Sequence, residues 1–273
     1  MTLTTSANTC MGVLIIILMT MCNPAKTGNT ETVAFLDTVR GEASLPHNQV
    51  HKEEPVFYKW AGNIRSNIPV SAWFVVKGKI LKGELTYLKT KYRSPITILG
   101  SVKEHNRVEF SEFQKNGLIT GTFSGKLSND SCTGTWSSPK SGRDFPFELV
   151  FKDTTLANAD TSFIPASIPG EYAYKFGDKG PGGGITIKEI SHELYSFEIN
   201  CVTGAPGYNV AELTADSIRF SDNAVVYSMP HADKCQFSIK VFKGFLIIDY
   251  LNENYDCGFG LNASVDGVFL KTK

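Results

Sequence analysis

The chain lacks a hydrophobic run long enough to cross a membrane as a helix. Its longest apolar stretch, residues 12–21, spans about ten residues, whereas a membrane-spanning helix needs about 20. A polar tract from Asn23 to Thr30 follows directly. A short apolar core near the N-terminus is typical of an export signal. We therefore expect residues 1–22 to be a signal peptide and the rest of the chain to leave the cytosol.

Cys22 comes directly after this run, where a lipoprotein signal places the cysteine that becomes acylated. The signal lacks two usual features, however. Residues 1–25 contain no Lys or Arg, and Met21 stands where lipoprotein processing prefers a small residue. The alternative is a simple secretory signal that is cut near Cys22 or Ala25. The expected location is extracytoplasmic: lipid-anchored at Cys22 in the bacterial cell envelope, or secreted.

Neither sign of charge dominates the sequence. Lys+Arg and Asp+Glu both number 27, and no block of like charge occurs. A nucleic-acid partner would need a concentrated positive field, and a polybasic membrane anchor would need a cluster of Lys and Arg. We therefore expect no nucleic-acid partner, and membrane contact only through a lipid anchor at Cys22.

Metal-ligand patterns are also scarce, since no Cys-x-x-Cys pair or Cys/His cluster occurs. His47 and His51 have helical i, i+4 spacing, but no helical pattern supports that geometry. Asn252, Asn254 and Asp256 alternate as calcium ligands do, yet the glycine and the later Glu of a calcium loop are missing. A hairpin turn explains them instead. The sequence therefore predicts no metal and no other cofactor.

Catalytic motifs are missing as well. The Gly-rich residues 177–184 precede a strand and lack the Lys-Ser/Thr of a phosphate-binding loop. In residues 121–125 the serine, Ser124, is one place late for a nucleophile elbow. We therefore expect no catalytic residues and a binding function rather than an enzymatic one. A hydrolase whose site is assembled from loops is the third option.

Five cysteines remain from Cys22 onward, and four if Cys22 is acylated. Four is an even number, which suits disulfides in an oxidising compartment. Cys235 and Cys257 form the best-supported pair, because each ends a strand-like run and a hairpin lies between them. Such a bridge would stabilise the fold by ~3 kcal/mol. A Cys132–Cys201 bridge would cross the expected domain boundary and stays open.

The sequence is rich in residues that form strands and tight turns, with 24 Gly, 18 Phe and 10 Tyr. Apolar and polar residues alternate in segments such as 119–127, 145–151 and 195–199. A period of two is typical of strands with one buried face. Turn residues recur every 8–12 positions or so, which favours antiparallel barrels or sandwiches. The modest helix candidates are residues 111–116 and 210–216.

The alternation is interrupted at two places. Residues 23–54 form a polar lead-in without periodicity, and residues 153–168 read as a linker that ends before Pro169. The sequence therefore predicts an all-β chain. Two antiparallel β-barrel or β-sandwich domains, residues 55–152 and 169–273, follow the signal and the lead-in in tandem.

Trp60, Trp73 and Trp136 are the side chains best able to line a pocket. Trp136 follows Gly134 by two places, a spacing found where small barrels begin or close. We expect these indoles to fill the core or to plug the end of a barrel, because a large aromatic ring contributes most when buried.

A stretch of about 35 residues near the end of the chain resembles a known class of protein. Residues 257–269, Cys-Gly-Phe-Gly-Leu-Asn-Ala-Ser-Val-Asp-Gly-Val-Phe, are similar to the closing motif of uncharacterised bacterial envelope β-domains, and the likeness extends back to Cys235. Some of those domains accompany lysozyme-inhibitor-like modules. The resemblance implies an extracytoplasmic β-domain with a Cys235–Cys257 bridge and no catalytic residue. An earlier block from Gly117 to Leu149 resembles strands of secreted bacterial proteins of unknown function.

The sequence thus leads to an exported, non-enzymatic protein of the binding or interaction type, whose partner is a protein or a small ligand. The alternative is an inhibitor of a cell-wall hydrolase such as lysozyme, which the C-terminal resemblance implies.

Overall fold

The fold is seen in a computed structural model that describes residues 55–153, 161–230, 232, 234–252 and 256–273. The predicted all-β class is confirmed: strands β1–β16 form two antiparallel sheets, and a single 3₁₀ turn, Glu104–Asn106, accompanies them in this part of the chain. Both sheets belong to one compact unit, His51–Lys273. The expected signal peptide, the polar lead-in and Cys22 lie outside the described residues.

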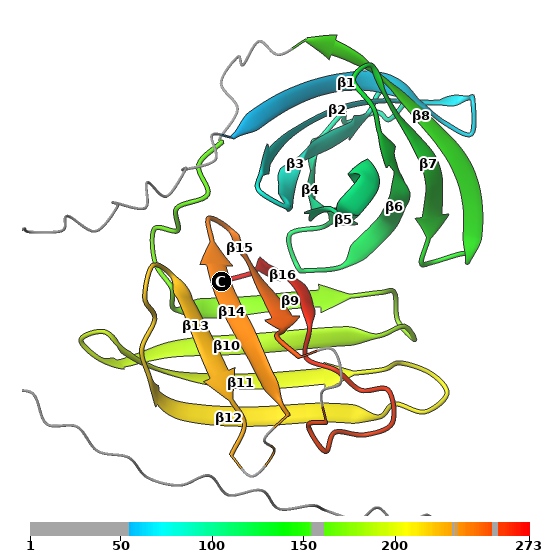
Figure 1. Cartoon of the computed structure of the whole chain (residues 1–273). Helices are drawn as coiled ribbons and strands as arrows, with labels where there is room; N and C mark the ends of the chain where they lie inside the picture. The colour runs from blue at the N-terminus through cyan, green and yellow to red at the C-terminus, as the bar shows by residue number, and fades with distance from the viewer. Residues whose placement is uncertain (1–54, 154–160, 231, 233, 253–255) are drawn as a thin grey trace, which may run out of the picture. The chain divides into compact units, whose positions relative to one another are not determined.

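The first sheet is a closed barrel in which each strand pairs with its neighbour in sequence and β8 returns to β1 (Figure 1). Closure leaves no edge strand with unpaired backbone groups, so the barrel satisfies its own hydrogen bonds. Its strands are β1 (Val56–Ile64), β2 (Ile68–Lys77), β3 (Ile80–Tyr87), β4 (Ile96–Val102), β5 (Arg107–Phe113), β6 (Ile119–Leu127), β7 (Ser131–Ser138) and β8 (Arg143–Asp153).

Aromatic rings fill the interior of this barrel. Phe110 stacks on Phe123 with ring centroids 4.4 Å apart, and Phe123 meets the edge of Phe147 at 5.0 Å. Phe74 links Phe110, at 6.3 Å, to Trp60, at 5.8 Å. These rings come from five strands, and all of them are buried. The interior is therefore a packed core built from every second residue of each strand, which faces inward.

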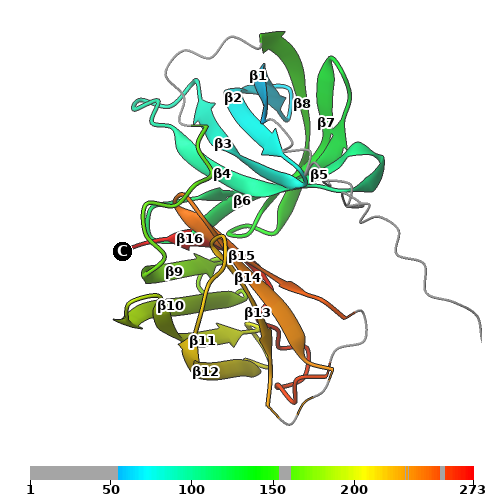
Figure 2. The same cartoon turned by 60° about the vertical axis from the view of Figure 1, so that its left-hand side comes forward.

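The second sheet contains eight strands in the order β12-β11-β10-β9-β16-β15-β14-β13. Strands β16 and β9 share only the pairs Leu270↔Ala173 and Lys271↔Tyr172. The sheet turns at this junction, and β13–β16 lie across β9–β12 in both views (Figures 1 and 2). The strands are β9 (Gly170–Lys175), β10 (Gly182–Ser191), β11 (Leu194–Val202), β12 (Val210–Ile218), β13 (Ala224–Ser228), β14 (Gln236–Phe242), β15 (Phe245–Tyr250) and β16 (Gly267–Lys271).

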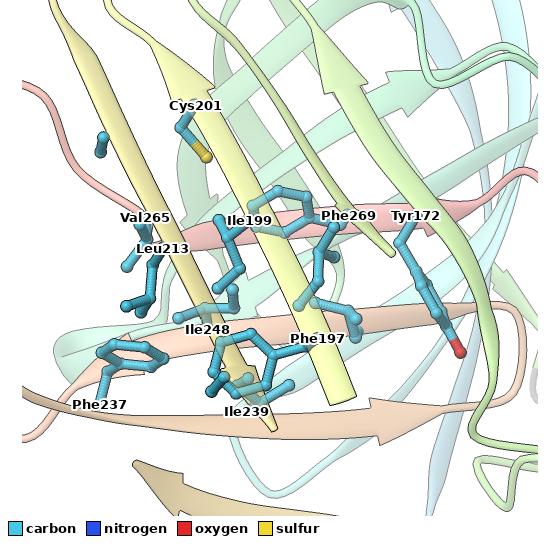
Figure 3. Packing of buried hydrophobic residues seen from close by; sticks show 14 of the residues in the cluster. Tyr172, Phe197, Ile199, Cys201, Leu213, Phe237, Ile239, Ile248, Val265 and Phe269 are labelled. Atoms are coloured by element: carbon cyan, nitrogen blue, oxygen red, sulfur yellow. The ribbon is translucent and has the colours of Figure 1, made fainter. Parts of the chain in front are cut away.

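The folded second sheet encloses a separate hydrophobic core. Phe197 and Ile199 of β11 pack with Phe237 and Ile239 of β14 and with Phe269 of β16 (Figure 3). All five side chains are at most 1% exposed. The two layers are therefore held together by apolar burial as well as by the short β9–β16 pairing.

A third apolar cluster joins the outer wall of the barrel to the second sheet. It combines barrel residues such as Leu99 and Phe113 with Phe245 and Ile247 of the second sheet. The chain passes from one sheet to the other between Asp153 and Gly170, where the linker was predicted, and residues 154–160 of that stretch lie outside the described part.

The two helix candidates were wrong. Residues 111–116 fall in β5 and the loop after it, and residues 210–216 fall in β12. In β12 Ala211, Leu213 and Ala215 are buried while the residues between them are exposed. Burial alternates with a period of two, so the packing of one face of the sheet overrides the helical preference of alanine. Throughout the described ranges, no helix is long and apolar enough to span a membrane.

Candidate functional site

Four hairpin loops meet at one end of the barrel. Because the strands alternate in direction, the loops that follow β1, β3, β5 and β7 lie at the same end. Two hydrogen bonds tie the first two loops together: Leu88 N–H donates to Pro69 O at 2.9 Å, and Lys89 Nζ donates to Asn67 O at 3.1 Å. We call this end the barrel rim and define it by residues 65–67, 88–95, 114–118 and 139–143.

A buried carboxyl group lies directly beneath the barrel rim. Glu112 of β5 points into the barrel and is 1% exposed. Its Oε1 accepts hydrogen bonds from the Tyr87 hydroxyl at 2.6 Å and from the Trp136 indole N–H at 3.2 Å. Its Oε2 accepts a hydrogen bond from the Thr120 hydroxyl at 3.0 Å. The four side chains come from β3, β5, β6 and β7, and we call them the Glu112 cluster.

The environment of Glu112 favours the neutral acid. Burial raises the pKa of Glu112, because loss of water penalises the carboxylate, while the three donated hydrogen bonds act in the opposite direction. Burial also raises the pKa of Tyr87, and the adjacent Glu112 adds to this rise. When Glu112 is protonated, Oε1 still accepts two hydrogen bonds and the Oε2 proton can be donated to Thr120 Oγ1. In that protonation state every member of the cluster is hydrogen-bonded and the cluster holds no buried charge.

The hydrogen-bond partners of Glu112 are a phenol, an indole and a hydroxyl, so they include neither a second carboxylate nor a histidine. General acid–base catalysis by Glu112 would need a group of that kind or a reacting molecule within hydrogen-bond reach. The arrangement instead joins four strands and closes one end of the barrel.

Gly121 of β6 leaves the room that the Glu112 cluster occupies. A Cβ atom at this position would lie 2.3 Å from Trp136 Nε1 and 2.9 Å from Glu112 Oε2. Both distances are shorter than van der Waals contact, so a larger residue would push the indole away from the carboxyl group. Glycine is required here by space, in the strand that lies between β5 and β7.

Sequence reasoning missed Glu112. The available signal was a carboxylate in phase with Val108 and Phe110 on the buried face of a strand, which is unusual for an acidic residue. The signal was overlooked because residues 111–116 were predicted as a helix. A helix repeats every 3.6 residues, so Glu112 was not compared with Val108 and Phe110 on one face of a strand.

A groove of about 940 Å³ lies between the outer wall of β4–β6 and strands β9, β15 and β16. Its floor is largely apolar, and charged residues stand along both margins. The floor includes Ile80, Leu99, Phe113, Ile119, Tyr174, Phe176, Ile247 and Val268. A concave apolar floor with a polar margin is the usual anatomy of a binding surface.

The margins of the groove differ in charge. On the barrel side, Lys103 forms an ion pair with Glu109, and Arg107 stands beside it. On the side of the second sheet, Asp249 and Asp266 line the groove. The barrel-side margin therefore carries charges of both signs, whereas the margin on the second sheet is acidic.

The Gly-rich stretch lies where a hairpin was expected. It spans the loop between β9 and β10 and enters β10 at Gly182. Phe176 N–H donates to Pro181 O at 2.9 Å and closes this loop. Gly204 packs against it, since a Cβ there would lie 2.5 Å from the Gly180 carbonyl carbon. Ser124 lies within β6, away from any turn into a helix.

The calcium-like residues take part in local hydrogen bonds. Asn252 Nδ2 donates to Lys234 O at 3.1 Å, and Asp256 Oδ1 accepts a hydrogen bond from Gly258 N–H at 3.1 Å. Asn254, His47 and His51 lie outside the described residues. Among the residues that are described, no group of three or more His, Cys, Asp or Glu side chains is placed to hold a metal ion.

The three tryptophans lie in different environments. Trp60 is fully buried in the barrel core, and Trp136 closes the barrel beneath its rim, as expected. Trp73 lies on the outer wall of the barrel instead. Its ring stacks on Phe57 with centroids 6.1 Å apart, and its indole N–H donates a hydrogen bond to Glu84 Oε2 at 3.1 Å. The outer wall is covered by the second sheet, so an outward-facing indole can also be partly buried.

The cysteines form one bridge. Cys235 and Cys257 are joined by a disulfide, as predicted. Cys132 lies in β7 of the barrel and Cys201 lies in β11 of the second sheet, and both are free and buried. The open possibility of a Cys132–Cys201 bridge was therefore wrong, because each thiol belongs to the core of a different sheet.

No family model, no curated protein and no solved structure matches this chain. The fold and the sites define an all-β protein with a filled barrel and a folded eight-stranded sheet. Its function has to be argued from the chain's own chemistry.

Proposed function

We propose that this chain is an exported, non-enzymatic binding protein that holds its partner on its outer surface. The observation that carries the proposal is the filled interior of the barrel. A carrier of small molecules needs a cavity for its ligand. Here a continuous series of ring contacts from Trp60 to Phe147 occupies that space.

The groove is the binding place that we favour. Its volume of about 940 Å³ is enough for an extended peptide segment or a surface loop of a protein. The partly exposed floor residues Ile80, Tyr174, Phe176 and Val268 offer apolar area for such a segment to cover. The opposed charges of Arg107 and Asp249 on its two margins favour a protein partner that carries both signs of charge.

Two features support export. The first is the short apolar run that ends at Cys22, as in a signal peptide. The second is the Cys235–Cys257 disulfide, since disulfides persist chiefly in oxidising compartments. The proposal includes attachment through a lipid on Cys22, with release into the medium as the alternative.

Export can be tested by the mass of the mature protein. Cleavage before Cys22 with an added diacylglyceryl group supports the anchored form, and cleavage without lipid supports the secreted form. A Cys22→Ser variant separates the two, because it should lose membrane association only if the thiol is acylated. An intact N-terminus on protein recovered from the cytosol contradicts export.

Binding in the groove can be tested by site-specific photocrosslinking. A photoreactive residue at Ser124 lies on the wall of the groove, whereas the same residue at Thr133 of β7 is exposed but outside it. In an envelope extract of the source cells, we expect one discrete adduct from position 124, absent from position 133. Asp249→Lys should abolish that adduct. Equal labelling at the two positions, or no adduct at position 124, contradicts the proposal.

The second candidate function is inhibition of a cell-wall hydrolase such as lysozyme. The disulfide supports this candidate, because Cys235 and Cys257, which it joins, both belong to the region of the C-terminal resemblance. Purified protein should then reduce lysozyme turnover when present in excess, and reduction of the disulfide should weaken this effect. Undiminished turnover removes the candidate.

A further inference from the structure

The barrel rim concentrates positive charge that is dispersed in the sequence. Seven basic residues lie on the barrel rim, and all seven are exposed. The rim segments contain no Asp or Glu, and the exposed Asp144 follows directly after the last of them. The seven are Arg65, Lys89, Lys91, Arg93, Lys115, Lys140 and Arg143. A chain with zero net charge therefore presents a strongly basic surface at one end of its barrel.

These cations are available to a partner. None of the seven takes part in the ion pairs found in the described part of the chain, which join Lys103 to Glu109, Lys175 to Asp178 and Lys273 to Glu171. Asp178, in the neighbouring β9–β10 loop, is thus already paired.

Aromatic rings accompany these cations at the barrel rim. Trp136 and Phe145 are stacked at 5.9 Å with an interplanar angle of 14°, and both are partly exposed. The Arg65 guanidinium lies 5.1 Å from the centre of the Phe145 ring. Tyr92 is 75% exposed, and Lys91 Nζ lies 5.3 Å from its ring. The rim thus combines flat ring faces with Lys and Arg side chains.

We propose that the barrel rim binds an acidic polysaccharide. The carboxylates of such a polymer pair with Lys and Arg, and Arg can hold a carboxylate through two hydrogen bonds. The C–H faces of its sugar rings can pack on the exposed ring of Tyr92 and on the parts of Trp136 and Phe145 that remain exposed. Cations distributed over four loops match a polymer that carries a charge on successive sugars better than they match one small anion.

Two other polyanions fit the rim less well. A lipid bilayer favours surfaces that also insert apolar side chains, and Tyr92 is the one large exposed apolar residue of the rim within the described loops. A nucleic acid could use the same cations and rings, but most nucleic acid lies inside the cell, which an exported protein leaves. In this respect the inference rests on the proposed export.

The test measures binding of the full chain to immobilised polygalacturonate over a series of salt concentrations. The rim variant replaces Lys89, Lys91 and Arg93 with Gln, all in one exposed loop. The matched control replaces Lys59, Lys126 and Lys152, which are exposed elsewhere on the barrel, with Gln. We expect the rim variant to lose affinity about tenfold or more and the control to stay within about twofold. Salt screens exposed charges over about 10 Å, so lysines far from the bound polymer contribute little to its affinity.

The salt dependence adds a second readout. Affinity should fall as salt rises, and the slope should be shallower for the rim variant, because fewer counterions are released on binding. Neutral dextran should not bind. Failure of polygalacturonate to bind at low salt overturns the proposal, as does an equal loss of affinity in the two triple variants.

Tighter binding to a single-stranded oligonucleotide, or to vesicles that contain phosphatidylglycerol, also overturns it in favour of the other polyanion. These results are independent of the groove, because none of the substituted residues lines it. Loss of the proposed polysaccharide binding at the rim can therefore be distinguished from failure of the photocrosslink at position 124 in the groove.

Discussion

Trp136 of β7 and Glu112 of β5 are joined by a hydrogen bond of 3.2 Å that crosses β6 at Gly121. Two strands that are not neighbours in the sheet are thereby linked inside the barrel. The link depends on a residue without a side chain in the strand between them. It also places a carboxyl group among apolar rings, and this has consequences for stability that can be measured.

The first prediction concerns Glu112→Gln and pH. The pKa of Glu112 is raised in the folded state, so the folded protein holds this proton more tightly than the unfolded chain does. The contribution of Glu112 to stability is therefore fully present below the unfolded pKa, near 4.5, and is lost as the pH rises toward the folded pKa. Glutamine keeps the acceptor for Tyr87 and Trp136 and donates to Thr120. Urea unfolding should show that the variant gains stability relative to the native protein as the pH rises from about 4 to 7. Parallel pH profiles would contradict this expectation.

The second prediction concerns Gly121→Ala. The new methyl group would overlap the Trp136 indole and the Glu112 carboxyl group, so we expect a loss of about 1–3 kcal/mol in the free energy of unfolding. The fluorescence of Trp136 should change as well, because the indole must move. Ser124→Ala, at an exposed position of the same strand, is the matched control and should stay within ~0.5 kcal/mol of the native protein. Equal stability of Gly121→Ala and the native protein would show that the Glu112 cluster can accommodate a methyl group at this position and would contradict the prediction.

The third prediction concerns the disulfide. Cys235 and Cys257 are 22 positions apart, and a bridge of this span restricts the unfolded chain. Replacing both residues with Ser should lower the free energy of unfolding by about 2–4 kcal/mol. A reducing agent should lower the melting temperature of the native protein to that of the double variant and leave the variant unchanged. A melting temperature that does not respond to reduction would show that the bridge is not formed.

The fourth prediction concerns the free thiols. Burial raises the pKa of Cys132 to about 12 and that of Cys201 to about 12, so the reactive thiolate is rare at neutral pH. In the folded protein, peptide mapping after treatment with a thiol reagent should find both cysteines unlabelled. In denaturant both should react fully. Fast labelling of either residue under native conditions would indicate that its sheet opens readily.

Much of the fold could be predicted, because alternation is a local property. The inward residues Phe123 and Leu127 of β6 were assigned to one face from their parity alone, whereas a register shift beside Phe113 turns Ile119, which has the same parity, to the outer wall. The Cys235–Cys257 pair was found because both residues end strand-like runs around one hairpin. The Gly-rich loop before Gly182 was recognised by the strand that follows it.

The candidate sites could not be predicted in the same way, because residues far apart in sequence compose them. Glu112 meets Tyr87, 25 positions earlier, and Trp136, 24 positions later. The groove combines residues on the outer wall of β4–β6 with Asp249 and Asp266 of the second sheet. Parity shows which face a side chain occupies, but not which distant strand lies opposite.

The sequence by itself determined an all-β chain with turns at glycines, two strand-rich regions and one best-supported disulfide pair, since these follow from periods and spacings within short segments. Only the tertiary structure decided that the barrel closes and is filled, that two cysteines stay apart in separate cores, and that seven cations meet at one end. The physical reason is the alternation of strand direction. In a closed antiparallel barrel every second loop returns to the same end, so charges that are dispersed along the chain become neighbours in space.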